Sequence, residues 1–424
     1  MKIYKFGGAS VRDAGGIENL AEIVSAVKDD LVIVVSAFGK TTDALEEVLN
    51  SWMKNDDGYR KHLDNVYNEH LSIAKALLGP GDPAIKRIHN SFAELREYLS
   101  REERSVYDYE YDQIVSCGEI WSTMLIAEYL NRRGLNVKWT DIRNKLVTDD
   151  RYREANILWG ESYLRIRPAF DLPGYSCYLT QGFIGATIAG QTTTLGREGS
   201  DYTAAVLATI LDAESVTFWK DVPGLLNADP RWLPDVEKLE EISYREAVEM
   251  TFSGAKVIHP KTIKPLHNRN IPLYVKSFTD PQGSGTLVTK EPGLKITIPV
   301  FVRKENQVLL SLLPKDFSFV MGDNLSRMFQ AFIKHGIRVN LIDASAVSIN
   351  VCIDDERAKI SNLLNDLKNE YSAVYNDNVE ILSVRHYTAE ALEKVSSGRE
   401  ILLEQRSRGM VRLVTRRQPA PAVK

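Results

Sequence analysis

The chain has 424 residues, enough for two or three domains with their own hydrophobic cores. Its 53 basic and 57 acidic residues give a net charge of -4, which argues against nucleic acid or a membrane surface as the main partner. The three cysteines lie far apart without metal-binding spacing, as is typical of a cytoplasmic protein with unpaired thiols. Met1 leads directly into an expected strand, and the longest apolar runs have strand length, so neither a signal peptide nor a membrane-spanning helix is expected.

The first 35 residues predict a βαβ unit with a glycine turn after its first strand. Residues 2–6 have strand character, Gly7 and Gly8 follow, and an amphipathic helix leads to the apolar run 31–35. A continuous apolar run of this length is typical of a parallel strand covered by helices on both faces. The two glycines allow the backbone to approach an anion closely, and Lys5 directly precedes them. We therefore expect a functional role for Lys5 rather than that of an exposed strand residue.

Small and hydroxylated residues follow the second expected strand, among them Ser36 and Thr42. Open α/β sheets bind ligands at the carboxyl ends of their strands, so this cluster is a candidate ligand site. Helices are expected from about 43 to 135, and their polar middle part, 55–104, has the character of an excursion from the sheet. Glu119 lies in this helical region beside a glycine, and taken alone it could equally be a solvated helix residue.

The stretch 191–202 is the strongest candidate site in the sequence. A strand is expected over 178–185, three threonines then lead to two glycines around Arg197, and Ser200 and Asp201 open an alanine-rich helix. A glycine loop at a helix N-terminus offers backbone N–H groups and the positive end of the helix dipole to an anion. Arg197 adds a planar guanidinium suited to a carboxylate or a phosphate. Ser200 and Asp201 could alternatively serve only as helix caps.

A second group of polar loops follows the next expected strand. Lys220 and Asp221 come directly after it, and a stretch rich in turn-forming residues leads to Arg231. Lys256 lies close to a glycine and could reach a phosphate, whereas His259, before a proline, is expected to be structural.

Beyond about residue 295 the pattern changes to βαββαβ, the order of a ferredoxin-like unit. The expected elements are a strand at 307–313, a helix at 323–335, strands at 337–342 and 347–353, a helix at 356–371 and a strand at 379–384. A further helix at 391–406 and a strand at 410–415 resemble a second, shortened unit. The tail 416–424 contains two prolines and is expected to be disordered.

The chemistry that these loops suit is phosphoryl transfer. Four cationic residues occur in these loops together with one acidic residue, Asp201: Lys5, Arg197, Arg231 and Lys256. Such a set suits the binding of a polyphosphate and a phosphoryl transfer that depends on positioning and electrostatics. A carboxylate acceptor is already ionised at neutral pH, so it needs no general base. This agrees with the lack of an obvious catalytic histidine in the sequence.

With these residues in place, the sequence resembles aspartate kinase, of the amino-acid kinase family. Seven motifs carry the resemblance and occur in the family's order over essentially the whole length: Lys5–Val11, Gly118–Glu119, Thr180–Gly185, Thr192–Ala204, Trp219–Gly224, Asp229–Arg231 and Gly254–Pro260. A single one of these motifs would be weak, but seven in register are highly specific.

The resemblance implies an α/β fold and an activity. Residues 1–292 would form a carbamate-kinase-like three-layer sandwich with a mainly parallel sheet, followed by a ferredoxin-like ACT regulatory unit at 300–388 and a partial second unit at 389–415. The reaction would transfer the γ-phosphoryl group of ATP, with Mg²⁺, to the side-chain carboxylate of L-aspartate. Its product, 4-phospho-L-aspartate, enters lysine, threonine and methionine synthesis. A homodimer or a dimer of dimers and an amino-acid effector at the ACT region are also implied.

The resemblance also implies roles for individual residues. Lys5 would contact the transferring phosphate, and Asp201 would orient this lysine and the metal–phosphate cluster, so these two would be catalytic. The residues expected to hold aspartate are Thr42, Glu119, Phe183, Arg197 and Ser200. Those expected to bind ATP are Lys5, Gly7, Gly8, Ser36, Lys220, Asp221, Arg231 and Lys256. Mg²⁺ would be held mainly through the ATP phosphates, without a protein-only metal site.

The chain departs from the family pattern at four positions: Ala9, where threonine is usual; Glu198, where a third glycine is usual; Lys220, in place of threonine; and Leu226, in place of tyrosine. Glu198 could partly neutralise Arg197. In the regulatory part, Asn340 and Ser345-Ala346 occupy places where lysine-inhibited relatives carry carboxylates, so weak or absent inhibition by lysine is expected. Two rival functions remain open: another kinase of the same fold, and an inactive amino-acid sensor.

Overall fold

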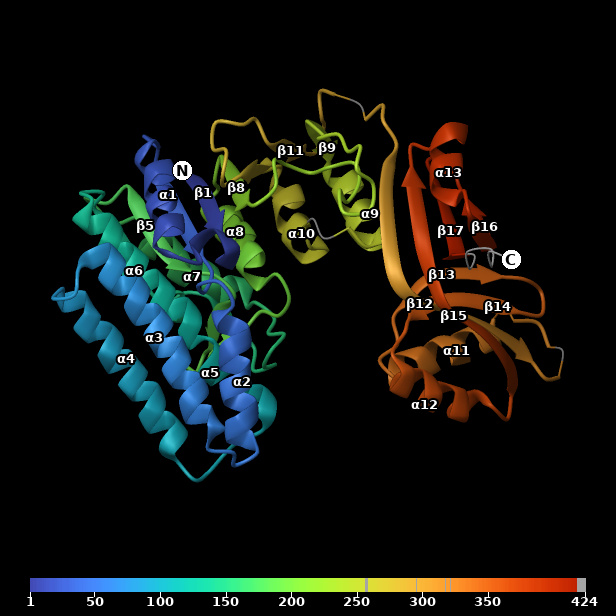
Figure 1. Cartoon of the computed structure of the whole chain (residues 1–424), viewed down its shortest axis with the longest axis horizontal. Coiled ribbons are helices and arrows are strands. Elements are labelled where there is room, and N and C mark those ends of the chain that lie inside the picture. The colour runs from blue at the N-terminus through green and yellow to red at the C-terminus, as the bar shows by residue number, and fades with distance from the viewer. Residues whose placement is uncertain (256–257, 295, 317, 321, 418–424) are drawn as a thin grey trace, which may run out of the picture. The chain divides into compact units, whose positions relative to one another are not determined.

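A computed structural model describes residues 1–255, 258–294, 296–316, 318–320 and 322–417 (Figure 1). The chain divides into two compact units. The first comprises residues 1–225, 238–248 and 258–294, and the second comprises the described residues of 226–237, 249–257 and 295–424. In the part of the chain that is described, no helix combines the length and the apolar character needed to cross a bilayer.

The first unit is built on an eight-stranded sheet in the order β3-β5-β2-β1-β8-β10-β11-β9. Its strands are β1 (Lys2–Phe6), β2 (Leu31–Val35), β3 (Val137–Thr140), β5 (Cys177–Gln181), β8 (Ser215–Lys220), β9 (Glu241–Ser243), β10 (Leu273–Ser277) and β11 (Thr286–Thr289). All neighbouring pairs are parallel except β10 with β11. The predicted α/β fold with a mainly parallel sheet is thus confirmed.

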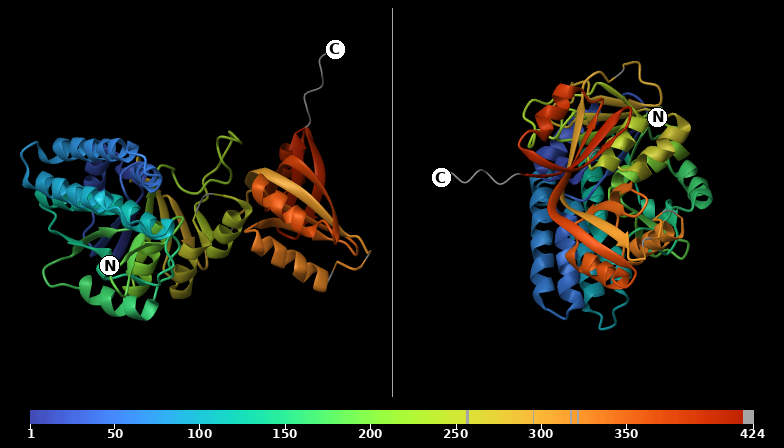
Figure 2. Two further views of the ribbon diagram at one scale, coloured as in Figure 1. Left: turned by 90° about the horizontal axis from the view of Figure 1, so that it is seen from below. Right: turned by 90° about the vertical axis from the view of Figure 1, so that its right-hand side faces the viewer.

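Both faces of this sheet are buried, as the apolar strand β2 predicts. Leu31, Ile33 and Val35 join a core formed with one set of helices, and the intervening Val32 and Val34 are buried without belonging to that core. The helices of this set are α1 (Ala14–Ser25), α2 (Thr41–Met53), α3 (Gly58–Leu78), α4 (Pro83–Ser100), α5 (Tyr107–Val115) and α6 (Cys117–Arg132). The long helices α3 and α4 lie alongside each other and form the predicted helical excursion (Figures 1 and 2).

Helix α8 (Gly199–Ile210) packs on strands β1, β2 and β8, with α10 (Pro260–Arg269) and α7 (Trp159–Ala169) beside it. Because side chains alternate along β1, Ile3 and Lys5 point to one face and Tyr4 and Phe6 to the other. Lys5 therefore meets α8 instead of solvent, which places its ammonium group at the carboxyl end of the sheet. The remaining helix is α9 (Tyr244–Ser253), and two short 3₁₀ turns are η1 (Gly8–Val11) and η2 (Ile142–Asn144).

The strand predicted over 178–185 is in fact two strands in two sheets. β5 ends at Gln181, and β6 (Ile184–Thr187) joins β4 (Val147–Thr148) and β7 (Thr192–Thr194) in a separate three-stranded sheet. The break falls at Phe183, whose φ of 70° is incompatible with a continuing strand. The prediction merged the two strands because Gln181 and Gly182 at the break are also compatible with a continuous strand.

The second unit contains the predicted ferredoxin-like order. Its elements are β12 (Val300–Pro314), α11 (Asp323–Lys334), β13 (Val339–Ala344), β14 (Ile349–Asp354), α12 (Arg357–Leu367) and β15 (Tyr371–Arg385), followed by α13 (Ala389–Ser396), β16 (Arg399–Arg406) and β17 (Met410–Arg417). They form one antiparallel sheet in the order β13-β14-β12-β15-β17-β16. A core of α11, α12 and the inward-facing residues of β12 and β14 closes the βαββαβ unit.

Two predictions for the end of the chain are wrong. The helix expected over 391–406 stops at Ser396, because Gly398 has a φ of 72° and residues 399–406 pair with β17 as strand β16. Leu402 and Leu403 of this strand pack on the core of β12, β13 and β17. The disordered tail expected over 416–424 is wrong for Arg416 and Arg417, which belong to β17; residues 418–424 lie outside the described part.

Candidate active site

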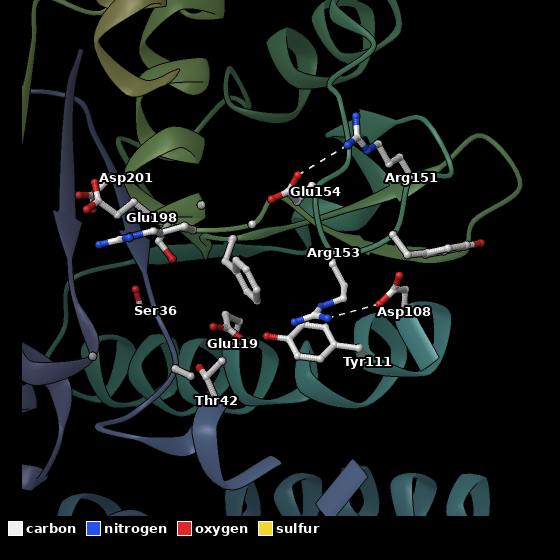
Figure 3. A pocket seen from close by; sticks show the side chains of 18 of the residues that line it. Ser36, Thr42, Asp108, Tyr111, Glu119, Arg151, Arg153, Glu154, Glu198 and Asp201 are labelled. Carbon is white, nitrogen blue, oxygen red and sulfur yellow. Dashed lines mark hydrogen bonds and ion pairs between the residues drawn. The ribbon is translucent and has the colours of Figure 1, made fainter. Parts of the chain in front are cut away.

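The carboxyl ends of the central strands open into a cavity of about 1060 Å³ within the first unit (Figure 3). The lining includes ten of the predicted site residues, which come from β1, the loop after β2, α2, α6, the β5–β6 break, the β7–α8 loop, α8 and β8: Lys5, Gly8, Ser36, Thr42, Glu119, Phe183, Arg197, Ser200, Asp201 and Lys220. Residues that are up to 215 positions apart in sequence are thereby brought to one place, as expected for strand ends in an α/β sheet.

Asp201 in the first turn of α8 is the charged centre of this cavity. Its side chain is 3% exposed; its Oδ1 lies 2.6 Å from Lys5 Nζ and its Oδ2 3.3 Å from Lys220 Nζ. Burial raises the pKa of Asp201, but the charges of Lys5 and Lys220 outweigh burial and hold this pKa at about 2. The N-cap of α8 is Glu198, without a side-chain cap bond. Asp201 is therefore a bridge between two lysines, and the alternative of a simple helix cap does not describe it.

At the glycine turn after β1, the backbone passes very close to the loop after β2. Glycine residues fit at this close approach and place no side chain in the space for a ligand. A Cβ atom on Gly8 would lie 2.8 Å from the carbonyl oxygen of Gly39 and 2.9 Å from that of Ala37, so no other residue fits without a backbone shift. A Cβ on Gly7 would face Lys5 Nζ at 3.5 Å. The two glycines thus keep the space next to the Lys5 ammonium free of side chains.

Glu119 in the first turn of α6 is also buried in the cavity wall, but unlike Asp201 it has no lysine beside it in the described part of the chain. Its side chain is 2% exposed, and its Oε2 makes no hydrogen bond with the described part of the chain. Burial raises the pKa of Glu119 to about 8, against backbone hydrogen bonds that lower it. At neutral pH the carboxyl group is mostly protonated, and it lines the cavity without a cationic partner among the described residues.

The wall around Phe183 depends on close backbone packing between the β5–β6 break and α8. A Cβ on Gly182 would lie 2.4 Å from Ser200 Cβ, and one on Gly199 would lie 2.7 Å from the Phe183 ring. The Phe183 backbone N–H donates to Thr203 Oγ1 at 3.1 Å. These contacts fix Phe183 and Ser200 side by side in the lining, next to the exposed Arg197 at the mouth of the cavity.

The sequence-based prediction missed the lining residues Asp108, Tyr111 and Arg153 and the buried Asp112 beside them. Asp112 on α5 accepts hydrogen bonds from the Thr194 backbone N–H at 2.8 Å, from Thr194 Oγ1 at 2.7 Å and from the Arg153 backbone N–H at 3.0 Å. Arg153 in turn lies 3.4 Å from Asp108 and over the Tyr111 ring, 4.6 Å from its centroid (Figure 3). Asp112 therefore joins the 149–155 loop to the strand that leads to Arg197. The signal available in the sequence was the cluster of charges at 149–154 directly after a short strand.

Glu198, for which partial neutralisation of Arg197 stays a prediction, makes a contact that the sequence did not suggest. Its Oε2 accepts a hydrogen bond from the backbone N–H of His259 at 2.8 Å. The predicted structural role of His259 is confirmed, since it is the N-cap of α10 and its Nδ1 accepts from the Lys261 N–H at 3.2 Å.

Four predicted nucleotide ligands are not among the cavity-lining residues. Gly7 directly precedes the lining residue Gly8 in the turn after β1. Asp221 follows β8 and is exposed. Arg231 belongs to the second unit, where its guanidinium binds Asp229 through Nε at 3.0 Å and Nη2 at 2.6 Å. Lys256 lies outside the described residues.

Comparison with known proteins agrees with this geometry. The model of the amino acid kinase family matches residues 1–277. Lysine-sensitive aspartokinase 3 of Escherichia coli is 34% identical over 358 residues, which cover 83% of this chain and 78% of that protein. Bifunctional aspartokinase/homoserine dehydrogenase 2 of Arabidopsis thaliana is 30% identical, but the match spans only 42% of its length and 87% of this chain.

Solved structures lead to the same family. The crystal structure of E. coli aspartokinase III in complex with aspartate and ADP (R-state) superimposes with a TM-score of 0.83 at 28% identity, covering 98% of this chain and 96% of the other. Clostridium acetobutylicum aspartate kinase, at 19% identity and a TM-score of 0.79 over 98% of this chain and 96% of its own, shares the fold. The chain therefore belongs to the amino acid kinase family, and its relatives within that family are aspartokinases.

Proposed function

We propose that this protein is an aspartate kinase that transfers the γ-phosphoryl group of ATP to the side-chain carboxylate of L-aspartate. The observation that carries the proposal is the buried Asp201 between Lys5 and Lys220, in a cavity that also holds Arg197 and Glu119. Such a cavity offers cations to a polyphosphate at one side and a guanidinium and a carboxyl group to an amino acid at the other. The aspartate and ADP bound in the E. coli relative support the same pair of ligands.

The reaction needs no proton transfer by the protein. A carboxylate oxygen of aspartate forms a bond to the γ-phosphorus, the bond from this phosphorus to the β,γ-bridging oxygen breaks, and ADP leaves with the electron pair. Charge builds on the phosphoryl oxygens and on the bridging oxygen during this step. Lys5 and Lys220 are the protein cations placed to stabilise it, and Asp201 holds both in position.

Aspartate is held by groups of complementary charge. Arg197 binds the α-carboxylate through its planar guanidinium, and Glu119 receives the ammonium group. An ammonium group beside Glu119 favours the ionised carboxylate, so binding of aspartate releases the proton that the free site carries at pH 7. Thr42, Phe183 and Ser200 complete the wall around the substrate.

The nucleotide occupies the side of the cavity formed by the glycine turn. Gly7, Gly8 and Ser36 line the path of the phosphates, and Asp221, Arg231 and Lys256 are the remaining proposed ATP ligands. Across the described residues, no three His, Cys, Asp or Glu side chains are arranged to hold a metal ion. Mg²⁺ would be held mainly by the ATP phosphates, as the resemblance implies, and would offset negative charge on their oxygens.

We further propose a cytoplasmic homodimer or dimer of dimers with residues 1–292 as the catalytic domain and 300–388 and 389–415 as the ACT-type regulatory units. An amino-acid effector would bind this regulatory part, but lysine is a poor candidate. Asn340, which stands where lysine-inhibited relatives carry a carboxylate, is already engaged by the ammonium group of Lys304, 2.7 Å from its Oδ1. Lys304 also lies 2.8 Å from Asp354, so a cation of the protein itself occupies this network.

The proposal is tested by an ATP-dependent hydroxamate assay with L-aspartate, with L-glutamate as the control substrate. Hydroxamate formed only with aspartate, and only by a protein that retains Asp201, would support it. ATP binding detectable by calorimetry without any product would overturn it in favour of an amino-acid sensor.

A further inference from the structure

We propose that Glu198 is a positioning residue of the phosphoryl-transfer site, whose carboxylate ties the N-cap of α10 to the glycine loop and lies in the same cavity wall as Lys220. This inference rests on the proposed function, in which Lys220 contacts the ATP phosphates. It assigns a role to a residue that the sequence comparison marks only as a departure from the family pattern.

The backbone of Glu198 shows that the side chain is not there for helix formation. Its φ of 55° and ψ of 27° lie in the left-handed region, where glycine is the residue without steric cost. As the N-cap residue of α8 it would be expected to bond the first turn of its own helix, yet it makes no such bond. A charged side chain at this position is therefore explained by contacts outside α8.

The first of these contacts is with α10. Glu198 Oε2 accepts the His259 backbone N–H at 2.8 Å, across 61 positions of sequence. His259 is the N-cap residue of α10, so the carboxylate sits at the positive end of that helix dipole, where a negative charge is favourable. One side chain thus joins the loop that carries Arg197 to the helix that begins at Pro260, the last residue of the Gly254–Pro260 motif.

The second contact is electrostatic and acts on Lys220. Burial lowers the pKa of Lys220, but Asp201, Glu198 and Asp221, in this order, raise it above its ordinary value. Lys220 Nζ lies 3.3 Å from Asp201 Oδ2, while Lys5 takes the other oxygen of Asp201 at 2.6 Å. The side chains of Lys5, Lys220, Glu198 and Asp201 carry no net charge together. The carboxylate of Glu198 thus acts with that of Asp201 to favour the protonated form of Lys220, and all three side chains line the same cavity.

Steady-state kinetics of four variants test this role: Glu198→Gln, Glu198→Gly, Lys220→Met and the double variant Glu198→Gly/Lys220→Met. We expect Glu198→Gly to lower kcat roughly 10- to 100-fold, because a misplaced catalytic group costs about this much. The KM for aspartate should stay the same. The double variant should be no slower than Lys220→Met, because Glu198 acts through Lys220. In Glu198→Gln the basic limb of the pH–kcat profile should move to lower pH, since the charge of Glu198 then no longer raises the pKa of Lys220.

Asp212→Gly is the matched control, because Asp212 also has a positive φ, of 51°, and makes an ion pair at 2.7 Å with Arg167 at the surface. It should leave kcat unchanged. Hydrogen exchange at the His259 amide supplies a readout that needs no activity, and it should become faster in Glu198→Gly but not in Glu198→Gln, which retains an acceptor oxygen.

Two outcomes would overturn the inference. An unchanged or raised kcat in Glu198→Gly with tighter ATP binding would mean that Glu198 only repels phosphates. Unchanged exchange at His259 would mean that the carboxylate does not hold α10. If the wild type forms no aspartyl hydroxamate while hydrogen exchange at His259 responds to the Glu198 variants as expected, the choice of substrate is wrong and the positioning role stands.

Discussion

Two carboxyl groups lie buried in the same cavity, and their surroundings drive their pKa values in opposite directions. Asp201 sits between two lysines and has a pKa of about 2, whereas Glu119 has no cationic partner among the described residues and a pKa of about 8. Burial acts on both in the same sense, so the neighbouring charges make the difference. The comparison separates two tasks: Asp201 is ionised and pairs with two protein cations, and in the proposed function Glu119 accepts a cation that the ligand brings.

Of the changes to these carboxyl groups, neutralising Asp201 should have the largest effect. Asp201→Asn keeps the size of the side chain but leaves Lys5 and Lys220 without their shared counter-charge, so kcat should fall on the order of 10²–10³-fold. Unfolding free energy should fall by on the order of 3 kcal/mol, as for loss of one partner from a buried ion pair. Kinetics and urea denaturation measure the two effects. Retention of full kcat would remove Asp201 from the mechanism.

The two carboxyl groups should change the stability of the protein with pH in opposite directions. The pKa of Asp201 is lowered on folding, so its contribution to stability is present above its unfolded pKa near 4 and is lost as the pH falls towards 2. The pKa of Glu119 is raised, so stability from this group is highest below pH 4 and declines towards pH 8. Glu119→Gln should therefore have a higher unfolding free energy than the wild type at pH 8, and this advantage should be smaller at pH 4. Denaturation curves at both pH values measure the difference.

Glu119→Gln should also impair the binding of aspartate. An amide cannot supply the negative charge that the substrate ammonium group requires, so the KM for aspartate should rise roughly 10- to 100-fold. The KM for ATP should remain unchanged, because the nucleotide side of the cavity keeps Lys5 and Lys220. An equal rise in both constants would point to general misfolding of the site instead.

Asp112 is a third buried carboxyl group, and its pKa lies between those of Asp201 and Glu119. Burial raises its pKa to about 6, against hydrogen bonds from Thr194 and Arg153 that lower it. Asp112→Ala leaves these donors unpaired, and unfolding free energy should fall by about 2 kcal/mol. Asp108→Ala removes the exposed partner of Arg153 and is the control, with an expected loss of about 0.5 kcal/mol or less. An equal loss of unfolding free energy in both variants would show that the hydrogen bonds of Asp112 contribute no more than the exposed ion pair of Asp108.

The smallest expected effect concerns lysine. Asp354 in the second unit resembles Asp201, because hydrogen bonds from Gln307 and Lys304 overcome burial and lower its pKa. A carboxylate already satisfied in this way has little to offer a free lysine, so lysine at sub-millimolar concentration should not inhibit. Lys304→Met combined with Asn340→Asp should gain sensitivity. Inhibition of the wild type in this range would refute this account of the regulatory part.

The sequence allowed prediction of much of this arrangement. Glycine turns after apolar strands located Lys5, and the loop around Arg197 located Asp201, because both signals are local. The break at Phe183 and the strand at 399–406 were not predicted, since a positive φ at Phe183 and the pairing of β16 with β17 depend on tertiary contacts. The roles of Asp112 and Glu198 were missed for the same reason: their partners lie 82 and 61 positions away.

The central claim is that Glu119 is protonated in the free site and ionised with aspartate bound. Calorimetric titration of L-aspartate at pH 7, repeated in buffers with different ionisation enthalpies, measures the protons released on binding. We predict release of close to one proton by the wild type and none by Glu119→Gln. Binding by the wild type without proton release would contradict the claim and remove Glu119 as the site of the substrate ammonium group.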